Sequence, residues 1–407
     1  MAASRSNRAP TMASRTASSV LVALCLLLLA ATDAEARHTR LVPAVFVFGD
    51  STVDVGNNND LNVTAGAKAN FPNYGVDFPR STPTGRFSNG LNTADLLVRG
   101  LGFRISPPAY LSLTTEKAIR SQMHKGINFA SAGSGVFDNT GRLPVCVVLL
   151  AHTDGSDIHK SINRANRCEH CFGEVIPMSQ QLEYFSELVD RMAKLSGPSK
   201  TARLLSRSIF FISAGSNDMF EYSAAPSNDA VFLRVLVATY KHHITALYEM
   251  GARKFSVVSI PPLGCIPSQR LRRLKQLGTQ GCFDPLNDLS LRSYPMLAAM
   301  LQQLADKLPG MRYSLADSYA MVSFVFANPR TDSWYFTELE AACCGGGPFG
   351  AAFACNEKAP LCHNRDDHLF WDANHPTQAV SAIAAQTIFA GNRTFVNPIN
   401  VRELALL

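Results

Sequence analysis

A serine, Ser51, follows directly after an apolar run near the start of the chain. Residues 44–48 (AVFVF) have the pattern of a buried strand, and Gly49 permits the tight turn that comes next. The serine is therefore expected at the carboxyl end of a first strand, the edge at which open α/β sheets bind ligands. Gly, Asp and Ser are also common in ordinary turns after strands, so this block alone does not distinguish a nucleophile from a turn residue.

A carboxylate and an imidazole stand three residues apart near the end of the chain, as Asp372 and His375 in FWDANHPTQAV. A carboxylate held against one ring nitrogen fixes the histidine tautomer and leaves the other nitrogen to take a serine proton. Of the ten histidines, only His375 has an aspartate three residues before it. Most single Asp-x-x-His pairs are surface polar groups. This pair gains weight because a Gly-Asp-Ser block precedes it in the same chain.

Two further blocks contain groups that can donate hydrogen bonds to a developing oxyanion. Residues 126–141 (GINFASAGSGVFDNTG) contain Gly133 and Gly135, which let backbone N–H groups approach a substrate closely. Residues 212–220 (ISAGSNDMF) place Asn217 after another apolar run, and its side-chain amide can donate an N–H. Taken singly, a Gly-rich stretch is more often a flexible turn and a lone Asn more often a helix cap.

Short apolar runs alternate with longer helical patterns, which predicts a parallel sheet covered by helices on both faces. The runs expected to form strands are residues 44–48, 208–213, 254–260 and 313–316. The stretches expected to form helices are residues 91–99, 179–195, 229–251, 286–308 and 377–389, the last being the final helix of the chain. No internal repeat and no linker rich in Pro or Ser interrupts them, so residues 37–407 are expected to form one domain. A complete G-x-S-x-G motif is missing, which argues against the α/β-hydrolase fold.

The chain begins with the features of a secretory signal peptide. Three arginines precede an apolar run at residues 20–31, and Ala34-Glu35-Ala36 suits cleavage after residue 36. A membrane-spanning helix needs about 20 apolar residues, so a removed signal (residues 1–36) is favoured over an anchor, and no later stretch is long enough. Removing three Arg, one Asp and one Glu lowers the formal net charge from +6 to +5. No basic run with interleaved aromatics is present, so nucleic acid is not an expected partner.

The cysteines also point to an oxidising compartment. Of the ten, Cys25 would leave with the signal, and six gather in the C-terminal half, which indicates up to three disulfides. These six are Cys265, Cys282, Cys343, Cys344, Cys355 and Cys362. A bond between the first two would close a short loop. The other four allow three pairings, and disulfide geometry disfavours a bond between the adjacent pair. Glycosylation sequons at Asn62 and Asn392 agree with secretion.

Together the four blocks resemble the plant-type GDSL esterase/lipase family, a branch of the SGNH hydrolases. The resemblance covers nearly all of the chain after residue 36. It includes GRFSNG (85–90), IPMSQQLEYF (176–185), PPLGC (261–265) and CCGGG (343–347). It implies a three-layer α/β/α sandwich around a central parallel sheet of about five strands.

The resemblance also implies roles for individual residues. Ser51 resembles the family's nucleophile, and Asp372 and His375 resemble its Asp-x-x-His pair. Three oxyanion donors are implied: the Ser51 N–H, the Gly133 N–H, which lies five residues after Asn128, and the Asn217 amide. Neither a metal nor an organic cofactor is implied.

Residues 143–171 depart from the family pattern. Family members usually pass from the Gly-rich block to IPMSQQ by a short connection, whereas this chain has a long segment without a clean period. It is either an inserted surface loop or translated intron sequence. Its apolar run VCVVLLA and its odd cysteines (Cys146, Cys168 and Cys171) favour the second. Its CEHC lacks a second pair at suitable spacing, which argues against zinc. Because the segment follows the Gly133 block, we expect it to lower activity, and equal turnover of a short acyl ester without it would refute this.

These features predict a secreted, monomeric serine esterase or lipase that hydrolyses acyl esters through an acyl-enzyme. Two alternatives remain open: an acyltransferase of the same fold that uses an alcohol in place of water, and a non-catalytic binding protein on this scaffold. Transfer of acyl groups to supplied alcohols would identify the first. Folded protein without fluorophosphonate labelling at Ser51 would identify the second. Lipid esters, cutin-like polyesters, acetylated wall sugars and phenolic esters all suit the same machinery.

Overall fold

The computed structural model describes residues 40–142 and 173–407. The described residues between 41 and 407 form one compact unit. The expected signal peptide, the atypical segment at 143–171 and their four cysteines (Cys25, Cys146, Cys168 and Cys171) lie outside the described residues. Within the two described ranges, no helix has both the length and the apolar character needed to cross a bilayer.

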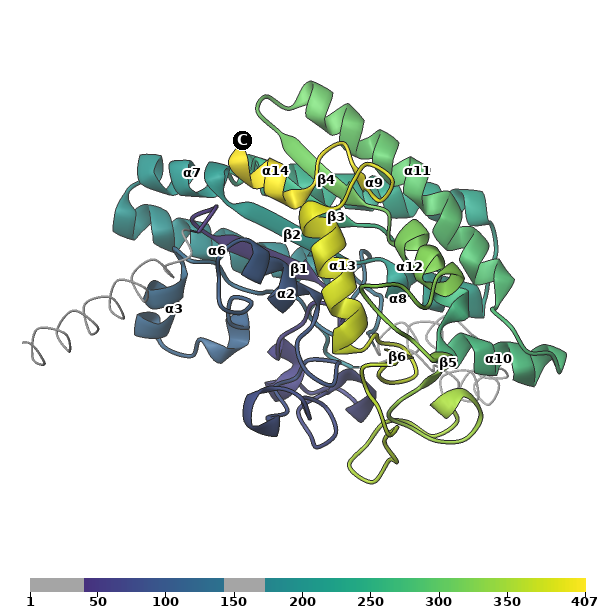
Figure 1. Cartoon of the computed structure of the whole chain (residues 1–407). Helices are drawn as coiled ribbons and strands as arrows, with labels where there is room; N and C mark the ends of the chain where they lie inside the picture. Colours follow the sequence, from purple (N-terminus) through teal and green to yellow (C-terminus); the bar gives the residue numbers. More distant parts are fainter. Residues whose placement is uncertain (1–39, 143–172) are drawn as a thin grey trace, which may run out of the picture. The chain divides into compact units, whose positions relative to one another are not determined.

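Five strands form the central sheet, in the order β1-β2-β3-β4-β7 (Figure 1). They are β1 (Val45–Gly49), β2 (Ile209–Ser213), β3 (Lys254–Val258), β4 (Arg312–Ala316) and β7 (Val396–Asn397). The first four run parallel and lie where the apolar runs predicted strands, whereas β7 pairs with β4 in the antiparallel direction. With only two residues, β7 has no recognisable sequence pattern. Gly49 lies opposite Ser213, and Ser213 lies opposite Val258, so the carboxyl ends of β1 to β3 are level.

Helices cover both faces of the sheet, which gives the three layers of the predicted α/β architecture. The core on one face is built with α6 (Met178–Ser196), α9 (Asp229–Glu249) and α11 (Asp284–Lys307). The core on the other is built with α2 (Thr93–Gly100), α13 (Gln378–Ala390) and α14 (Val401–Leu406). The prediction that residues 377–389 form the final helix is wrong, because α14 follows them. Its six residues are too few to show a helical period, although Asn400 and Glu403 form a capping box at its start.

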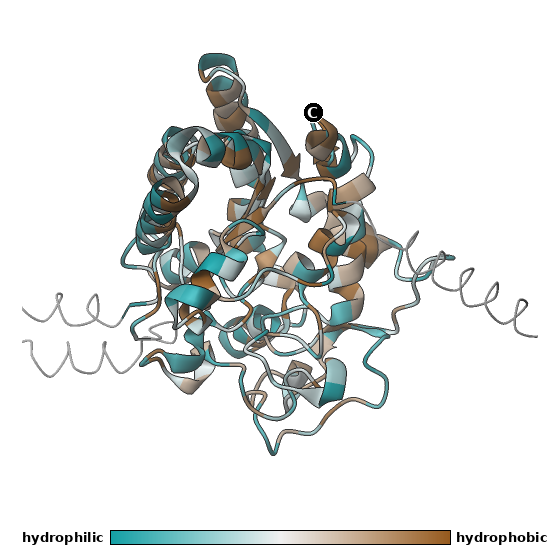
Figure 2. Ribbon diagram, turned by 90° about the vertical axis from the view of Figure 1, so that its left-hand side faces the viewer, coloured by the Kyte–Doolittle hydropathy of each residue, from teal (hydrophilic) through white to brown (hydrophobic). Residues whose placement is uncertain are grey.

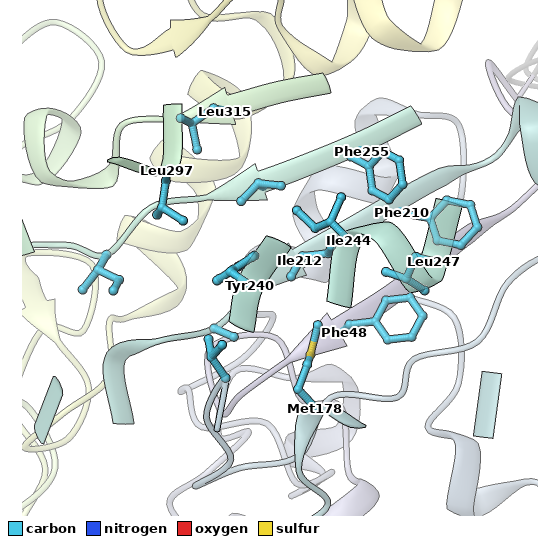
Figure 3. Packing of buried hydrophobic residues seen from close by; sticks show 14 of the residues in the cluster. Phe48, Met178, Phe210, Ile212, Tyr240, Ile244, Leu247, Phe255, Leu297 and Leu315 are labelled. Atoms are coloured by element: carbon cyan, nitrogen blue, oxygen red, sulfur yellow. The ribbon is translucent and has the colours of Figure 1, made fainter. Parts of the chain in front are cut away.

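Alternate residues of each strand point into different cores. Phe46 and Phe48 pack on the α6 and α9 side, and Val45 and Val47 pack on the other. This explains why the strands are apolar throughout, as the continuous apolar runs predicted. Figure 3 shows Phe48, Phe210 and Phe255, which come from adjacent strands, together with Tyr240, Ile244 and Leu247 of α9 in the same core. In Figure 2 the strands are mainly brown, while the long outer helices carry teal on their exposed sides.

Shorter elements complete the described chain. They are α3 (Glu116–Gln122), α7 (Pro198–Arg207), α8 (Ser216–Ala224), α10 (Pro267–Leu277), α12 (Ser318–Ala327) and a separate two-stranded sheet of β5 (Glu338–Ala342) and β6 (His368–Phe370). These helices span only two or three turns each, and the sequence pattern did not predict them.

Three disulfides join the six clustered cysteines. The expected pair Cys265–Cys282 is confirmed, and the remaining four pair as Cys343–Cys362 and Cys344–Cys355. The adjacent cysteines 343 and 344 are therefore not bonded to each other, as disulfide geometry predicts. Both sequon asparagines, Asn62 and Asn392, are exposed.

Candidate active site

Ser51, His375 and Asp372 lie in one line of short contacts at the carboxyl edge of the sheet. The His375 Nε2 atom is 2.7 Å from the Ser51 Oγ atom, although the two residues are 324 positions apart in the sequence. The other ring nitrogen, Nδ1, lies 2.8 and 2.9 Å from the two carboxylate oxygens of Asp372. Ser51 follows β1, and His375 lies in the loop between β6 and α13. The structure therefore brings the predicted nucleophile, base and carboxylate together.

The turn that carries Ser51 is held by Gln181 of α6. The side chain of Gln181 accepts the Gly49 N–H at 2.9 Å and donates to the Gly49 carbonyl at 2.9 Å, so it pairs with both backbone groups. Gly49 has a φ of 141°, and a Cβ there would overlap the carbonyl oxygen of Ser213 on the next strand. Only glycine fits this close approach. The position of Ser51 is thus fixed by its strand, by the neighbouring strand and by one buried amide.

Two buried aspartates lie beside the nucleophile. Burial raises the pKa of Asp50 to about 6, and the hydrogen bonds from the Thr52 N–H and hydroxyl partly oppose that rise. Burial likewise raises the pKa of Asp54 to about 6. The Asp54 carboxylate accepts the N–H groups of Gly56, Asn57 and Ala132. Asp54 therefore joins the segment after Ser51 to the Gly-rich block.

The Asp372 carboxylate is buried and fully partnered. It accepts the backbone N–H groups of Asn374 and His375, in addition to the imidazole, and the hydroxyl of Tyr74 at 2.7 Å. Burial by itself would raise the pKa of Asp372, but the adjacent His375 and these hydrogen bonds hold it below the usual value. Burial beside this carboxylate raises the pKa of Tyr74 well above its usual value. Tyr74 therefore keeps its proton and donates to Asp372.

Aromatic rings and two disulfides surround this side of the site. A small core contains Tyr74, Phe87, Trp371 and the cysteines 343, 344 and 355. The centroid of the Phe87 ring lies 4.7 Å from that of His375. The Cys344 N–H donates to the Trp371 carbonyl at 2.7 Å, directly before Asp372. The loop that carries the base is therefore attached to the disulfide-linked segment.

The three predicted oxyanion donors lie in the wall of the same cavity as Ser51 and His375. Within residues 40–142 and 173–407, no acceptor is bonded to the N–H of Ser51 or of Gly133. The Asn217 amide nitrogen donates to the Ser134 carbonyl at 2.8 Å. An amide nitrogen has two hydrogens, so this bond orients the side chain and leaves one donor for a ligand.

The loop that contains Gly133 is held mainly by Asp218. This buried carboxylate accepts the N–H groups of Val136 and Phe137 and the hydroxyl of Thr140. A Cβ on Gly135 would overlap the Asp218 carboxylate, so glycine is required there. Because Asp218 directly follows Asn217, one short segment both supplies a predicted donor and fixes the loop that supplies another.

Three supporting residues were not foreseen as part of the site: Tyr74, Gln181 and Asp218. Gln181 lies in IPMSQQLEYF, which the sequence marked only as a point of resemblance. Asp218 stands beside a predicted donor and could have been suspected from that. Tyr74 lies in no regular element and 298 residues from Asp372, so no local pattern identifies it.

A large cavity of about 1450 Å³ opens at these residues. Its walls include the segments after β1 and β2, the helices α8, α10, α12 and α13, and the loop of His375. In the part of the chain that the structure describes, no cluster of three or more His, Cys, Asp or Glu residues could hold a metal ion.

Known proteins resemble this chain over most of its length. Residues 45–388 match the family model described as GDSL-like Lipase/Acylhydrolase. One GDSL esterase/lipase of Arabidopsis thaliana is 35% identical over 376 residues, which is 90% of this chain and 86% of that protein. A second from the same plant is 34% identical over 372 residues, with 89% and 92% of the two chains covered. A third is 33% identical over 369 residues, with 88% and 91% covered.

Proposed function

The chain belongs to the GDSL-like lipase/acylhydrolase family and is an ester hydrolase, and from this premise we propose that it cleaves carboxylic esters through Ser51, His375 and Asp372. The observation that carries the proposal is the 2.7 Å contact between His375 Nε2 and Ser51 Oγ, with Asp372 on the other ring nitrogen. Such an arrangement lets a serine hydroxyl lose its proton as it attacks a carbonyl.

The first half of the reaction forms an acyl-enzyme. His375 Nε2 accepts the Ser51 proton while Oγ bonds to the ester carbonyl carbon. Asp372 holds the ring orientation and stabilises the imidazolium. The oxyanion of the tetrahedral intermediate accepts hydrogen bonds from Ser51 N–H, Gly133 N–H and the Asn217 amide. Each such donor typically contributes about 10²–10³ in rate. The alcohol then leaves with the proton from His375.

The second half repeats these steps with water. His375 takes a proton from a water molecule, whose oxygen attacks the acyl carbon, and the same three donors hold the oxyanion. Collapse of the intermediate returns the proton to Ser51 and releases the carboxylic acid. All groups required for these steps come from the chain itself.

Labelling with a fluorophosphonate probe tests the nucleophile. We expect the purified protein to hydrolyse p-nitrophenyl butyrate and to carry the label on the peptide that contains Ser51. Ser51→Ala should lose both properties. Ser323→Ala is the matched control, because Ser323 lies on α12 and does not line the cavity. Folded protein that is neither labelled nor active would contradict the proposal and would favour the binding-protein alternative.

We propose that the protein is secreted as a monomer. The chain starts with a signal-like segment, three disulfides lie among its described residues, and both sequon asparagines are exposed. Disulfides of this kind persist in oxidising compartments. Expression in a eukaryotic secretory system, followed by N-terminal sequencing, should give a secreted protein that begins at Arg37. Retention of residues 1–36 in the secreted protein would contradict cleavage at that position.

The cavity also leaves room for an acyl acceptor other than water. Its volume of about 1450 Å³ exceeds the roughly 300–1,000 Å³ typical of small-molecule sites. An acyltransferase is therefore the second candidate. Adding alcohols of increasing size and measuring acylated product against free acid separates the two activities.

A further inference from the structure

We propose that the part of the cavity between α12 and α13 binds an aliphatic chain of the ester and limits the chain length that the enzyme accepts. This inference rests on the proposed function, because the chain would extend from an ester bound at Ser51. We call this part of the cavity the aliphatic arm. It is defined by Met321, Val322 and Val325 of α12 and by Val380, Ile383 and Ala384 of α13.

Both helices line the arm with residues at helical spacing. On α13, Val380, Ile383, Ala384 and Thr387 line it, at spacings of three, four and seven residues. Residues with these spacings lie on one side of a helix. The Thr387 hydroxyl donates to the Ile383 carbonyl of its own helix at 2.8 Å, so its oxygen already has a partner.

The facing helix repeats this pattern. On α12, Ser318, Met321, Val322 and Val325 line the arm at the same spacings. Val258 and Ile260, at and just beyond the end of β3, add further apolar side chains to the cavity wall. The walls of the arm are therefore mostly hydrocarbon, contributed by two helices and a strand end.

The composition of both helices fits an apolar ligand. Neither SYAMVSFVFA in α12 nor QAVSAIAAQTIFA in α13 contains a charged residue. A helix that covers a sheet normally carries a polar face toward water. On α13, Ala385 packs in the core shared with α2, while Val380, Ile383 and Ala384 line the cavity and are only partly buried. An apolar substrate would cover these side chains, which explains why they are left partly exposed in the cavity of Ser51.

The dimensions of the arm set an approximate chain length. Val380 and Thr387 are seven residues apart, which corresponds to about 10 Å along a helix axis. An extended hydrocarbon advances about 1.25 Å for each C–C bond, so this face alone accommodates roughly eight carbons. Phe395, which follows α13, contacts Phe324 of α12 with ring centroids 5.5 Å apart. This ring contact connects α12 to the segment that follows α13, and both rings line the cavity.

The opposite part of the cavity has a different chemistry. There α10 contributes Gln269, Arg272 and Gln276 to the wall. Arg272 is also bonded to the carbonyl and hydroxyl of Ser223, which holds its side chain in place. An ester with a hydrocarbon chain on one side and a polar group on the other matches both walls. Acetylated sugars lack the hydrocarbon chain and would leave the arm unfilled.

The test is a chain-length series with a substitution that blocks the arm. Ala384→Phe places a ring in the arm, and Ala390→Phe makes the same change at an exposed position of the same helix, outside the cavity. For p-nitrophenyl esters, we expect the kcat/KM of the native protein to rise with acyl length up to about ten carbons. The rise should be about fourfold per methylene, the gain typical of complete burial. Ala384→Phe should lower the ratio of kcat/KM on the decanoate ester to kcat/KM on the butyrate ester at least tenfold, and Ala390→Phe should leave this ratio unchanged.

A second series and a second variant keep the test decisive. Butyrate esters of alcohols with increasing chain length report the opposite orientation, in which the arm holds the alcohol. Val322→Phe blocks the arm from the α12 side if Ala384→Phe does not fold. A length dependence in either series that Ala384→Phe or Val322→Phe shortens, and that Ala390→Phe leaves unchanged, supports the proposal. Native protein with no length dependence in both series, or blocking variants with unaltered profiles, overturns it.

Direct binding separates this inference from the proposed function. Decanoic acid should bind the native protein, with at least tenfold weaker binding to Ala384→Phe, as measured by titration calorimetry. If the protein is active but does not bind decanoic acid and shows no length dependence, the proposal of the aliphatic arm is wrong and the proposed hydrolase function stands. If the protein binds decanoic acid but is neither active nor labelled at Ser51, the aliphatic arm stands as a binding site and the proposed hydrolase function is wrong.

Discussion

Ser51 and His375 meet at one contact, but they are supported by different parts of the molecule. Ser51 directly follows a strand buried in the central sheet, and the turn before it is fixed by Gln181 and by the backbone of the next strand. Asp372 and His375 lie in an irregular loop outside that sheet. Their loop is held by the Tyr74 hydroxyl, by aromatic packing and by a segment with two disulfides.

This difference separates two ways of fixing a catalytic group. The nucleophile side depends on apolar strands whose packing also stabilises the whole fold. The base side depends on a few polar contacts and covalent links that stabilise one loop. We therefore expect loss of a polar contact that supports the base, such as the Tyr74 hydroxyl, to affect activity more than stability. Substitutions in the strands that support Ser51 should lower both activity and stability. The predictions below test this, starting with the largest expected effect.

Removing the nucleophile or the base should have equal and non-additive effects. Ser51→Ala and His375→Ala are each expected to lower kcat by about 10⁴-fold or more, because the two residues act as one unit. The double variant should be no slower than either single variant. Ester hydrolysis at high enzyme concentration measures the residual rates. A double variant slower by the product of the two losses would mean that the residues act independently.

An oxyanion donor on the sheet side should contribute less than the nucleophile. Asn217→Ala is expected to lower kcat by about 10²–10³-fold with little change in KM, since the amide would act mainly in the transition state. The substitution also removes the hydrogen bond from Asn217 to the Ser134 carbonyl. The thermal unfolding midpoint of the variant is therefore measured as a control for lost stability. A rise in KM with unchanged kcat would instead indicate a role in substrate binding.

Removal of the two disulfides should have different effects on kcat, because they support different parts of the molecule. Replacing either Cys265–Cys282 or Cys344–Cys355 by alanines should lower the free energy of unfolding by about 2–4 kcal/mol. The second pair adjoins the base loop through the bond from the Cys344 N–H to the Trp371 carbonyl. We therefore expect a several-fold loss of kcat only for Cys344→Ala/Cys355→Ala, measured where both variants are folded. Equal losses of kcat would remove the distinction between the two regions.

Tyr74→Phe should have the smallest effect of the four. It removes the hydroxyl that donates to Asp372 and leaves the ring packed, so we expect kcat to fall by about two- to threefold and KM to stay the same. Leu or Ala at this position would also disturb packing and is a poorer test. An unchanged kcat would show that the backbone N–H groups and His375 suffice to hold the carboxylate.

The same variant should alter the pH dependence of stability. The pKa of Asp372 lies below its unfolded value, so this carboxylate contributes stability that is present above the unfolded pKa and is lost as pH falls through the folded pKa. Loss of the Tyr74 donor raises the folded pKa of Asp372 toward the unfolded value. The acid-induced loss of stability should therefore be smaller and should end at a higher pH in Tyr74→Phe, as measured by unfolding midpoints across pH 3–7. An unshifted acid transition would contradict this role of the hydroxyl.

Some parts of the fold were predictable because they have strong local patterns. The four parallel strands are continuous apolar runs, and the helices α6, α9 and α11 are long enough to show their period. The strands β6 and β7 and the helix α14 were missed because they are too short for such a pattern, whereas β5 is as long as β1 and was missed because its sequence, ELEAA, is not an apolar run. The pairing of cysteines 343, 344, 355 and 362 could not be chosen from the sequence, since it depends on which segments meet in the fold.

The sequence by itself determined the residue types of the candidate site and the class of fold. Gly-Asp-Ser after a strand, Asp-x-x-His before a helix and the Gly-rich block are local patterns with local causes. Tertiary structure alone decided the contact between His375 and Ser51, the support of Asp372 by Tyr74, and the apolar arm between α12 and α13. These features join residues far apart in the chain, and the packing of the sheet and its helices sets their distances.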